Sequence, residues 1–277
     1  MFLGKKPIIY RYSKAILILV TLYGKGHKDV SPKTLIEYRQ GFFFYIKEQN
    51  VQLSVKDLSR LLDVPEGDIY RWIKEESIPF YRVHDQYRFN RLEILDWATA
   101  HKIKISWRIL QDTASQDQSF ATLTEMIHKG GIHDGVEGKD KKTLLTNAVR
   151  LLKLPSNIDQ ESLLSAILAR EELGSTGFGD GIAIPHARYP IVTHIPGAIA
   201  SVCFAKTPVD FGSMDGKPVH CLFTLVSPTV RSHLQALSRI AFVLRNAHVR
   251  DVLAHPRSPE VVLAAIAEAE KAIGKPA

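Results

Sequence analysis

The 277-residue chain contains little cysteine, with only two residues of this type, Cys203 and Cys221. Both lie in apolar runs and neither belongs to a C-x-x-C pair, which argues against a disulfide-stabilised fold and a cysteine metal site. We expect reduced packing residues in a cytoplasmic protein. Four histidines also lack the spacing of metal ligands: His194, His220, His248 and His255. No metal site and no other cofactor is therefore expected.

The chain also lacks an apolar run long enough to cross a membrane. Residues 15–23 follow several basic residues and resemble the start of a signal peptide, but a bilayer span needs about 20 apolar residues. No cleavage pattern of small residues follows promptly. We therefore predict that residues 1–50 are a leader, either disordered or the product of a misplaced start site, and that the protein has no membrane partner.

The net charge of +7 is unevenly distributed. Residues 1–50 carry nine basic and three acidic side chains, residues 51–108 carry ten and nine, and residues 109–277 carry seventeen of each. The basic excess belongs to the leader, so charge alone is poor evidence for a nucleic-acid partner. With 45% hydrophobic and 23% charged residues, the composition is that of a soluble globular protein with a sizeable core.

Regular periodicity begins after the leader. Apolar residues over 55–62 recur at the spacing of one helical face, and Ser54 with Asp57 forms a capping-box pattern at the start of this helix. A tight turn at 63–65 leads to a second helix over 66–76. Two short helices joined in this way predict a helix-turn-helix.

The next residues complete a small domain. Extended runs at 78–83 and 87–89 predict a hairpin, and a third helix follows from Asn90 to Ala100. This layout and the runs Asp-Leu-Ser-Arg-Leu-Leu and Ile-Pro-Phe-Tyr-Arg-Val resemble the excisionase-type winged helix domains, which are related to the MerR regulators. We assign this domain to residues 51–103, and the resemblance implies DNA binding.

In such a domain the second helix would enter the major groove and the hairpin would contact the DNA backbone or the minor groove. The expected groove contacts are Tyr70, Arg71 and Lys74. The expected phosphate contacts are Arg82, Arg88 and Arg91. A net charge of +1 is low for a DNA-binding domain, and the fold also serves protein contacts. An adaptor that binds no DNA therefore remains an alternative.

A second domain is predicted over 119–272, after a polar linker at 104–118 that has no periodicity. Helical and extended patterns are mixed in this domain, which predicts an α/β fold with a sheet covered by helices on both faces. We expect helices at 121–129, 140–152, 161–171, 232–245 and 259–270, a strand with a turn at 130–136, and buried strands at 197–205 and 219–226.

The chemistry is expected in the stretch from Arg170 to Arg188. Glycine has no Cβ, so a glycine-dense loop can fold close to an anion and direct backbone N–H groups toward it. Pro185 restricts the backbone that enters His186, and we predict that the loop presents this imidazole as a nucleophile. The spacing fits neither G-x-G-x-x-G nor a P-loop, so a nucleotide pocket is not expected. The glycines are Gly174, Gly177, Gly179 and Gly181.

The run Gly-Ser-Thr-Gly-x-Gly-x-Gly-Ile-Ala-Ile-Pro-His resembles the active-site signature of the enzyme IIA domains of the bacterial phosphoenolpyruvate:sugar phosphotransferase system, of the fructose/mannitol and nitrogen-regulatory type. The resemblance implies a mixed sheet flanked by helices. It implies that His186 accepts a phosphoryl group from HPr or its nitrogen-branch counterpart, assisted by His233 on a later helix and by Arg170 on the helix before the loop. The implied phosphate-binding residues are Gly174, Ser175, Thr176 and Gly177.

The domain combination favours regulation over sugar uptake, because we find no membrane domain, IIB-like cysteine site or HPr-like domain in the sequence. The main interpretation is a cytoplasmic phosphocarrier, not a stand-alone metabolic enzyme, whose phosphorylation state controls a DNA-binding domain. The expected partners are an HPr-type protein, DNA, and a regulated target protein or a IIB component. In the alternative interpretation, the domain is a protein-binding module and His186 is never phosphorylated.

Overall fold

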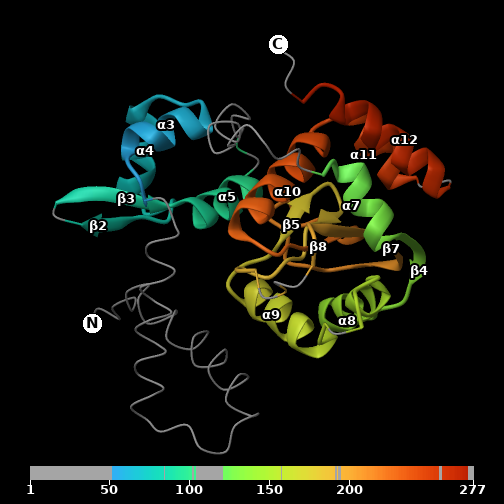
Figure 1. Ribbon diagram of the computed structural model, residues 1–277. Helices are drawn as coiled ribbons and strands as arrows, with labels where there is room; N and C mark the ends of the chain where they lie inside the picture. Colours follow the sequence, from blue (N-terminus) through green and yellow to red (C-terminus); the bar gives the residue numbers. More distant parts are fainter. Residues whose placement is uncertain are drawn as a thin grey trace, which may run out of the picture. The chain divides into compact units, whose positions relative to one another are not determined.

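The computed structural model describes residues 52–83, 85–101, 103, 121–156, 158–190, 192, 195–255 and 258–273 (Figure 1). The predicted leader at 1–50 and the predicted linker at 104–118 lie outside these residues. Within the described ranges, no helix combines the length and the apolar character needed to cross a bilayer.

The helix-turn-helix forms as predicted. Helix α3 (Val55–Leu62) begins with the expected capping box, in which the Ser54 hydroxyl accepts from the amide of Asp57 and the Asp57 carboxylate accepts from the amide of Ser54. Its C-cap adopts the left-handed conformation that ends a helix. Helix α4 (Glu66–Lys74) follows after the predicted turn.

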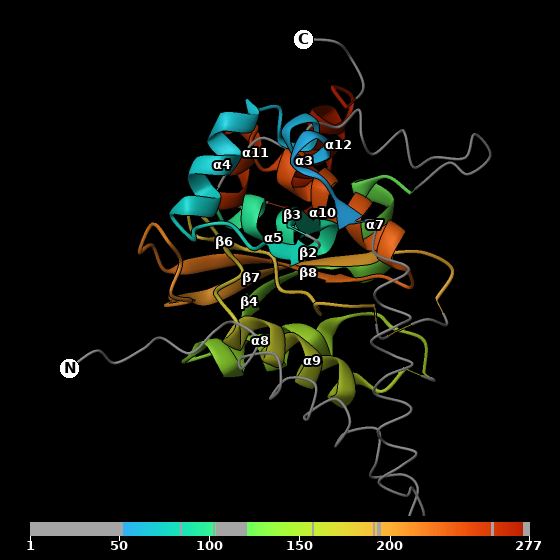
Figure 2. The ribbon, with the colours of Figure 1, turned by 90° about the vertical axis from the view of Figure 1, so that its left-hand side faces the viewer.

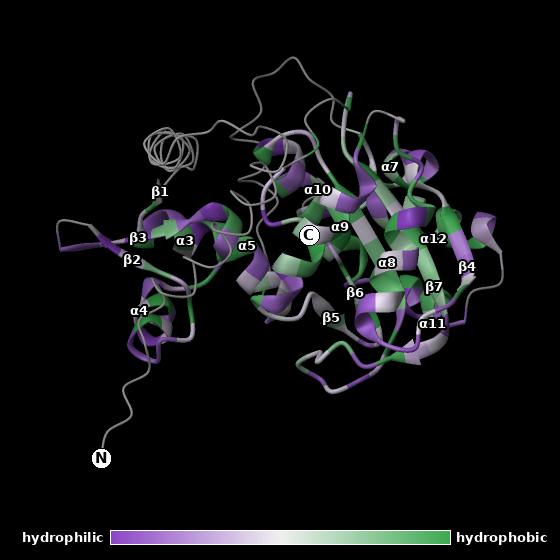
Figure 3. Ribbon diagram, turned by 90° about the horizontal axis from the view of Figure 1, so that it is seen from below, coloured by the Kyte–Doolittle hydropathy of each residue, from purple (hydrophilic) through white to green (hydrophobic). Residues whose placement is uncertain are grey.

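The predicted hairpin is also present, as strands β2 (Tyr81–Val83) and β3 (Gln86–Asn90). A short strand that the sequence analysis missed, β1 (Gln52–Leu53), pairs with the other edge of β3. Near the turn, β3 starts with hydrophilic residues (Figure 3), and Arg82 pairs with Asp85 there. Helix α5 (Arg91–Ala100) follows at once, and its N-cap Asn90 accepts from two backbone amides of the first turn.

The second domain contains a five-stranded mixed sheet in the order β4-β7-β8-β6-β5. The β7–β8 and β5–β6 pairs are antiparallel, and the β4–β7 and β6–β8 pairs are parallel. Cys203 and Cys221 are free and fully buried on the two central strands, and burial raises the pKa of the Cys203 thiol to about 11. Their predicted packing role is confirmed. The strands are β4 (Ile132–Val136), β5 (Gly177–Gly179), β6 (Ile182–Ala183), β7 (Ile199–Val209) and β8 (Val219–Val226).

Helices cover both faces of this sheet, as predicted (Figure 2). Alternate residues of β7 point to opposite faces, so Val202 joins one apolar core and Cys203 the other. Helices α8 (Lys141–Leu151) and α9 (Gln160–Glu172) cover one face. The other face is covered by α7 (Leu123–Gly130), α10 (Val230–Val243), α11 (Ala247–Ala254) and α12 (Pro259–Glu270).

Candidate functional site

The glycine-rich stretch forms a tight β-hairpin, where the sequence analysis expected a loop without strands. Gly177 of β5 lies opposite Ala183 of β6, and the turn residues Asp180 and Gly181 have φ of 53° and 73°. Consecutive positive φ angles are typical of a two-residue hairpin turn and favour glycine. A Cβ on Gly181 would also collide with the ring of His220. The glycines therefore fix the geometry of the segment that enters the site.

The backbone at His186 is hydrogen-bonded to strand β8. The carbonyl of Pro185 accepts from the amide of Leu225 on β8, at 2.9 Å, and His186 forms a parallel bridge with the same strand. Nδ1 of His186 lies 2.7 Å from the carbonyl oxygen of Ile184. Because a carbonyl only accepts, Nδ1 carries a proton, and Nε2 is the nitrogen left for chemistry. The residue is only 4% exposed.

His233 lies beside His186, as the resemblance implied, with 5.2 Å between the two ring centroids. It occupies the first turn of α10, is 2% exposed, and has its Nδ1 2.8 Å from the hydroxyl of Ser227. Burial lowers the pKa of His233 to about 3, and the positive charges of His186 and Arg170 act in the same direction. The ring is therefore neutral near pH 7.

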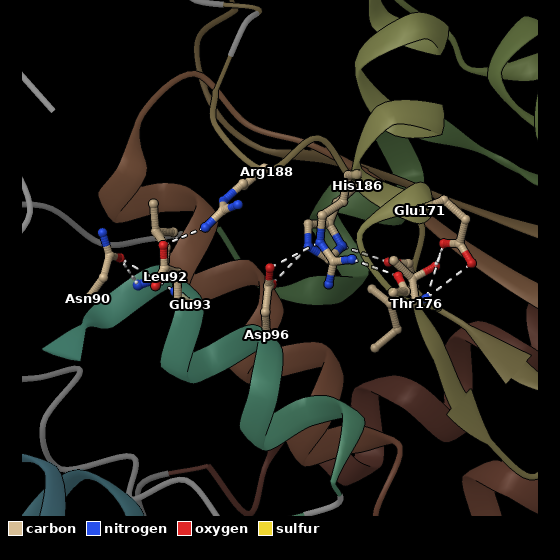
Figure 4. A network of polar contacts seen from close by, with 11 residues as sticks. Asn90, Leu92, Glu93, Asp96, Glu171, Thr176, His186 and Arg188 are labelled. Atoms are coloured by element: carbon tan, nitrogen blue, oxygen red, sulfur yellow. Dashed lines mark hydrogen bonds and ion pairs between the residues drawn. The ribbon is translucent and has the colours of Figure 1, made fainter. Parts of the chain in front are cut away.

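Arg170, in the last turn of α9, reaches the same place. Its Nη1 donates to the carbonyl of Gly174 at 2.9 Å, and its Nε donates to Oδ2 of Asp96 at 3.0 Å. The other oxygen of Asp96 lies 3.0 Å from Nε2 of His186 (Figure 4). The structure thus brings His186, His233 and Arg170 together, and adds a carboxylate that the sequence analysis missed.

Asp96 comes from α5, the third helix of the helix-turn-helix domain. Burial alone would raise the pKa of this carboxyl group, but the charges of Arg170 and His186 outweigh it and hold the pKa well below its ordinary value. The group is therefore a carboxylate that accepts from Nε2. Since Nδ1 of His186 also faces an acceptor, a ring that satisfies both contacts carries a proton on each nitrogen.

The cavity beside the His186 ring is small, at about 10 Å³. That is about the room for one water molecule. Gly174, one of the four predicted phosphate-binding residues, is not part of the cavity lining, and its carbonyl accepts from Nη1 of Arg170. The other three predicted phosphate-binding residues line the cavity: Ser175, Thr176 and Gly177.

Internal hydrogen bonds occupy the donors of this turn. The amide and the hydroxyl of Thr176 donate to the buried carboxylate of Glu171, the amide at 3.0 Å, and the amide of Gly177 donates to the hydroxyl of Ser175 at 3.0 Å. Lys141 completes the ion pair with Glu171 at 3.2 Å. In this arrangement these donors hold the turn in shape, and their role toward phosphate stays a prediction.

The predicted DNA-contact residues are mostly on the surface. Tyr70 is 50% exposed on α4, where Arg71 and Lys74 are also exposed. Arg71 pairs with Asp68 of the same helix at 2.8 Å.

The predicted contact residues on the hairpin and on α5 vary in how exposed they are. Arg82 is exposed and pairs with Asp85, whereas Arg88 is half-buried and donates to the carbonyl of Tyr87. Arg91, the first residue of α5, is only 8% exposed, so its predicted phosphate contact has the least support from the structure.

The described residues contain no group of three or more histidine, cysteine or acidic side chains placed to hold a metal ion.

Comparisons with known proteins match both domains. Residues 125–269 match the family described as "Phosphoenolpyruvate-dependent sugar phosphotransferase system, EIIA 2", and residues 53–102 match the family "Helix-turn-helix domain". The nitrogen regulatory protein of Pseudomonas aeruginosa is 39% identical over 135 residues, which are 47% of this chain and 85% of that protein. The nitrogen regulatory protein of Bradyrhizobium diazoefficiens is 31% identical over 147 residues, 52% of this chain and 94% of that protein.

Among solved structures, the crystal structure of the nitrogen regulatory protein IIA-Ntr from Neisseria meningitidis is 33% identical, with a TM-score of 0.47, and covers 52% of this chain and 98% of that chain. The match to the EIIA 2 family spans more than half of the chain and contains His186, His233 and Arg170, while Asp96 lies in the helix-turn-helix match. The chain therefore belongs to the EIIA 2 family of the phosphoenolpyruvate-dependent sugar phosphotransferase system, with a helix-turn-helix domain preceding the EIIA region.

Proposed function

We propose that the protein is a regulatory phosphocarrier that accepts a phosphoryl group on Nε2 of His186 from an HPr-type protein and couples this state to transcriptional control through DNA. The observation that carries the proposal is the hydrogen bond that keeps a proton on Nδ1 of His186. Its Nδ1 donates to the Ile184 carbonyl, so the reactive nitrogen is Nε2, which faces the side chain that Arg170 also binds.

In the proposed transfer, the lone pair of Nε2 attacks phosphorus in line. The electron pair of the donor's N–P bond returns to the donor's imidazole nitrogen as the new N–P bond forms, so nothing is oxidised or reduced. The proton that Nε2 shares with Asp96 leaves to solvent before the attack, while the bond from Nδ1 to Ile184 keeps the ring in place.

Two neighbours are suited to stabilise the transferring group. Arg170 offers charged donors to the phosphoryl oxygens. His233 is neutral, and if the hydroxyl of Ser227 donates to its Nδ1, the Nε2 proton is available for a phosphoryl oxygen. The reaction needs no metal and no cofactor. A cytoplasmic location is in keeping with the two free cysteines.

Phosphorylation of the whole chain tests this function. The protein is incubated with phosphoenolpyruvate, enzyme I and HPr, or the nitrogen-branch counterparts, and its intact mass is measured. We expect a gain of one phosphoryl group, located by fragmentation on the peptide that contains His186. If neither carrier produces a gain, the alternative of a protein-binding module is favoured. Onward transfer to a IIB component or a regulated target protein can then be followed by loss of the same group.

The DNA part of the proposal rests on the basic residues of α4 and the hairpin, of which Arg71, Lys74 and Arg82 are exposed and Arg88 is half-buried. We expect Arg71→Ala with Arg88→Ala to weaken binding to promoter DNA at least about tenfold, and to lower the slope of log K against log salt by about 1 for each phosphate interaction that the substitutions remove. The control Lys142→Ala with Arg150→Ala removes two exposed charges from α8. Equal DNA affinity of the two double variants would show that the assigned contact residues are wrong. Failure of the wild-type protein to bind its own promoter DNA in a salt-dependent way would favour the adaptor that binds no DNA.

A further inference from the structure

His186 is buried because a helix of the other domain covers it. Asp96 of α5 bridges Nε2 of His186 and Nε of Arg170, with both contacts at 3.0 Å. One turn earlier on the same helix, Glu93 pairs with Arg188. Two carboxylates of α5 are thus paired with groups of the second domain, Glu93 with Arg188 and Asp96 with His186 and Arg170 (Figure 4).

Apolar packing surrounds these ion pairs. Leu92 and Leu95 of α5 are 3% and 1% exposed, and they pack against Leu234 of α10. Tyr189 and Val230 extend this cluster. The buried face of α5 therefore combines an apolar contact with two charge pairs, which is the composition of a specific docking surface.

The opposite face of α5 belongs to the core of the helix-turn-helix domain. Ile94 and Ala98 are fully buried there with Phe89 of β3 and Leu58 of α3. Because one short helix serves both cores, α5 is expected to move together with its domain rather than alone.

Asp96 also stands where the phosphoryl group has to go. The phosphoryl group would be bonded to Nε2 of His186 and hydrogen-bonded to Arg170. In this structure the carboxylate of Asp96 contacts both of these side chains. Only about 10 Å³ of free space remains beside the ring. That is too little for a phosphoryl group, since it is about the volume of one water molecule.

We propose that α5 is the resting occupant of the surface on which a phosphoryl donor must dock, and that phosphorylation of His186 displaces Asp96 and with it the helix-turn-helix domain. The inference rests on the proposed function and adds the regulation of the same site. The donor and α5 compete for one surface, so each state of His186 selects one arrangement of the DNA-binding domain.

Displacement follows from charge and hydrogen bonding. A phosphorylated Nε2 has no proton to donate to Asp96, and it places about −1.5 to −2 units of charge beside the carboxylate. Arg170 cannot satisfy both anions in the space that Asp96 fills. A buried carboxylate that has lost its partners is strongly unfavourable, so α5 leaves the surface.

Two conservative variants on α5 test the competition without altering the face that the donor binds. Asp96→Asn removes the charge that pairs with Arg170, and Glu93→Gln removes the charge that pairs with Arg188 but leaves an oxygen for the hydroxyl of Tyr81. Coupling between two sites is typically worth a factor of about 5 to 150. We expect each variant to accelerate phosphorylation of His186 by subsaturating phospho-HPr about tenfold, and the double variant to react faster still.

The matched control is Asp134→Asn, which neutralises an exposed carboxylate on β4 and should keep the wild-type rate. If Asp96→Asn and Glu93→Gln also react at the wild-type rate, α5 does not compete with the donor and the proposal is wrong.

A second measurement needs no donor. His186→Glu places a permanent anion opposite Asp96, and hydrogen exchange of the whole chain then reports on α5 and α10. We expect amides of 92–96 and 230–237 to exchange about tenfold faster than in wild type. Unchanged protection in these segments would overturn the proposal, even if the transfer rates followed expectation.

The two measurements separate the two hypotheses. If no variant takes up phosphate from any carrier, the proposed function fails, whereas faster exchange in His186→Glu still supports displacement of α5 by negative charge. If wild type is phosphorylated but the variants change neither the phosphorylation rate nor the hydrogen exchange, the proposed phosphocarrier function is supported and the displacement of the helix-turn-helix domain is wrong.

Discussion

His186→Ala is expected to abolish uptake of a phosphoryl group, and His233→Ala to slow it about 100- to 1000-fold. The first change removes the nucleophile. The second removes a neutral, buried ring that lies 5.2 Å from it and is available to donate to the transferring group. Loss of one such donor in a buried site typically costs this factor in rate. Single-turnover mixing with phospho-HPr, followed by intact mass, measures both.

Matched variants separate chemistry from structure at His233. His233→Gln keeps a side-chain donor and should recover part of the rate. Ser227→Ala removes the hydroxyl that orients the ring, 2.8 Å from Nδ1, and should fall between wild type and His233→Ala. If His233→Ala lowers the transfer rate by the same factor in an Asp96→Asn background, an indirect effect through α5 is excluded. A wild-type rate in His233→Ala would show that the second imidazole takes no part in the transfer.

Local sequence rules predicted most of the elements. The capping box of Ser54 and Asp57 marks the start of α3, and α12 begins at the predicted residue, Pro259. Four elements were missed: strands β5 and β6 of the glycine-rich stretch, strand β1 and helix α11. Strand β1 is two residues long, and α11 buries only Val249 and Leu253, which is too weak a periodic signal to define a helix.

The site was only partly accessible from the sequence. The motif around His186 identified the ring, and the resemblance brought in His233 and Arg170, which the structure places together. The segment before it was expected as a loop because its four glycines let the backbone fold close to an anion, whereas the structure pairs Gly177 with Ala183 in a hairpin.

Asp96 could not be found from local rules, because it lies 90 residues before His186 in another domain. One signal pointed to it. Helix α5 is apolar on two faces, with Ile94 and Ala98 on one and Leu92 and Leu95 on the other, whereas a surface helix of a small domain needs only one apolar stripe. A second apolar face indicates a second packing partner, which here is the surface around the phosphoryl acceptor.

The burial of His233 also predicts how stability depends on pH. Its pKa is about 3 in the folded protein and 6.5 as the ordinary value, so between these limits the unfolded chain binds the extra proton. The contribution of the neutral ring to the free energy of unfolding is fully present above about pH 6.5. It is lost as pH falls toward 3, by at most about 1.4 kcal/mol per pH unit. Asp96, whose pKa is also lowered, adds to the loss at the acid end of this range.

Urea unfolding of wild type and His233→Gln at pH 7, 5 and 4 measures this dependence. His233→Gln is expected to be less stable than wild type at pH 7, because glutamine fills the buried space less well, but to lose less stability on acidification. His248→Gln removes a histidine that is exposed on α11 and is the control for losing a histidine as such. A parallel decline of wild type and His233→Gln would mean that His233 is already protonated or hydrated in the folded protein, and a neutral donor beside His186 could then no longer explain the transfer.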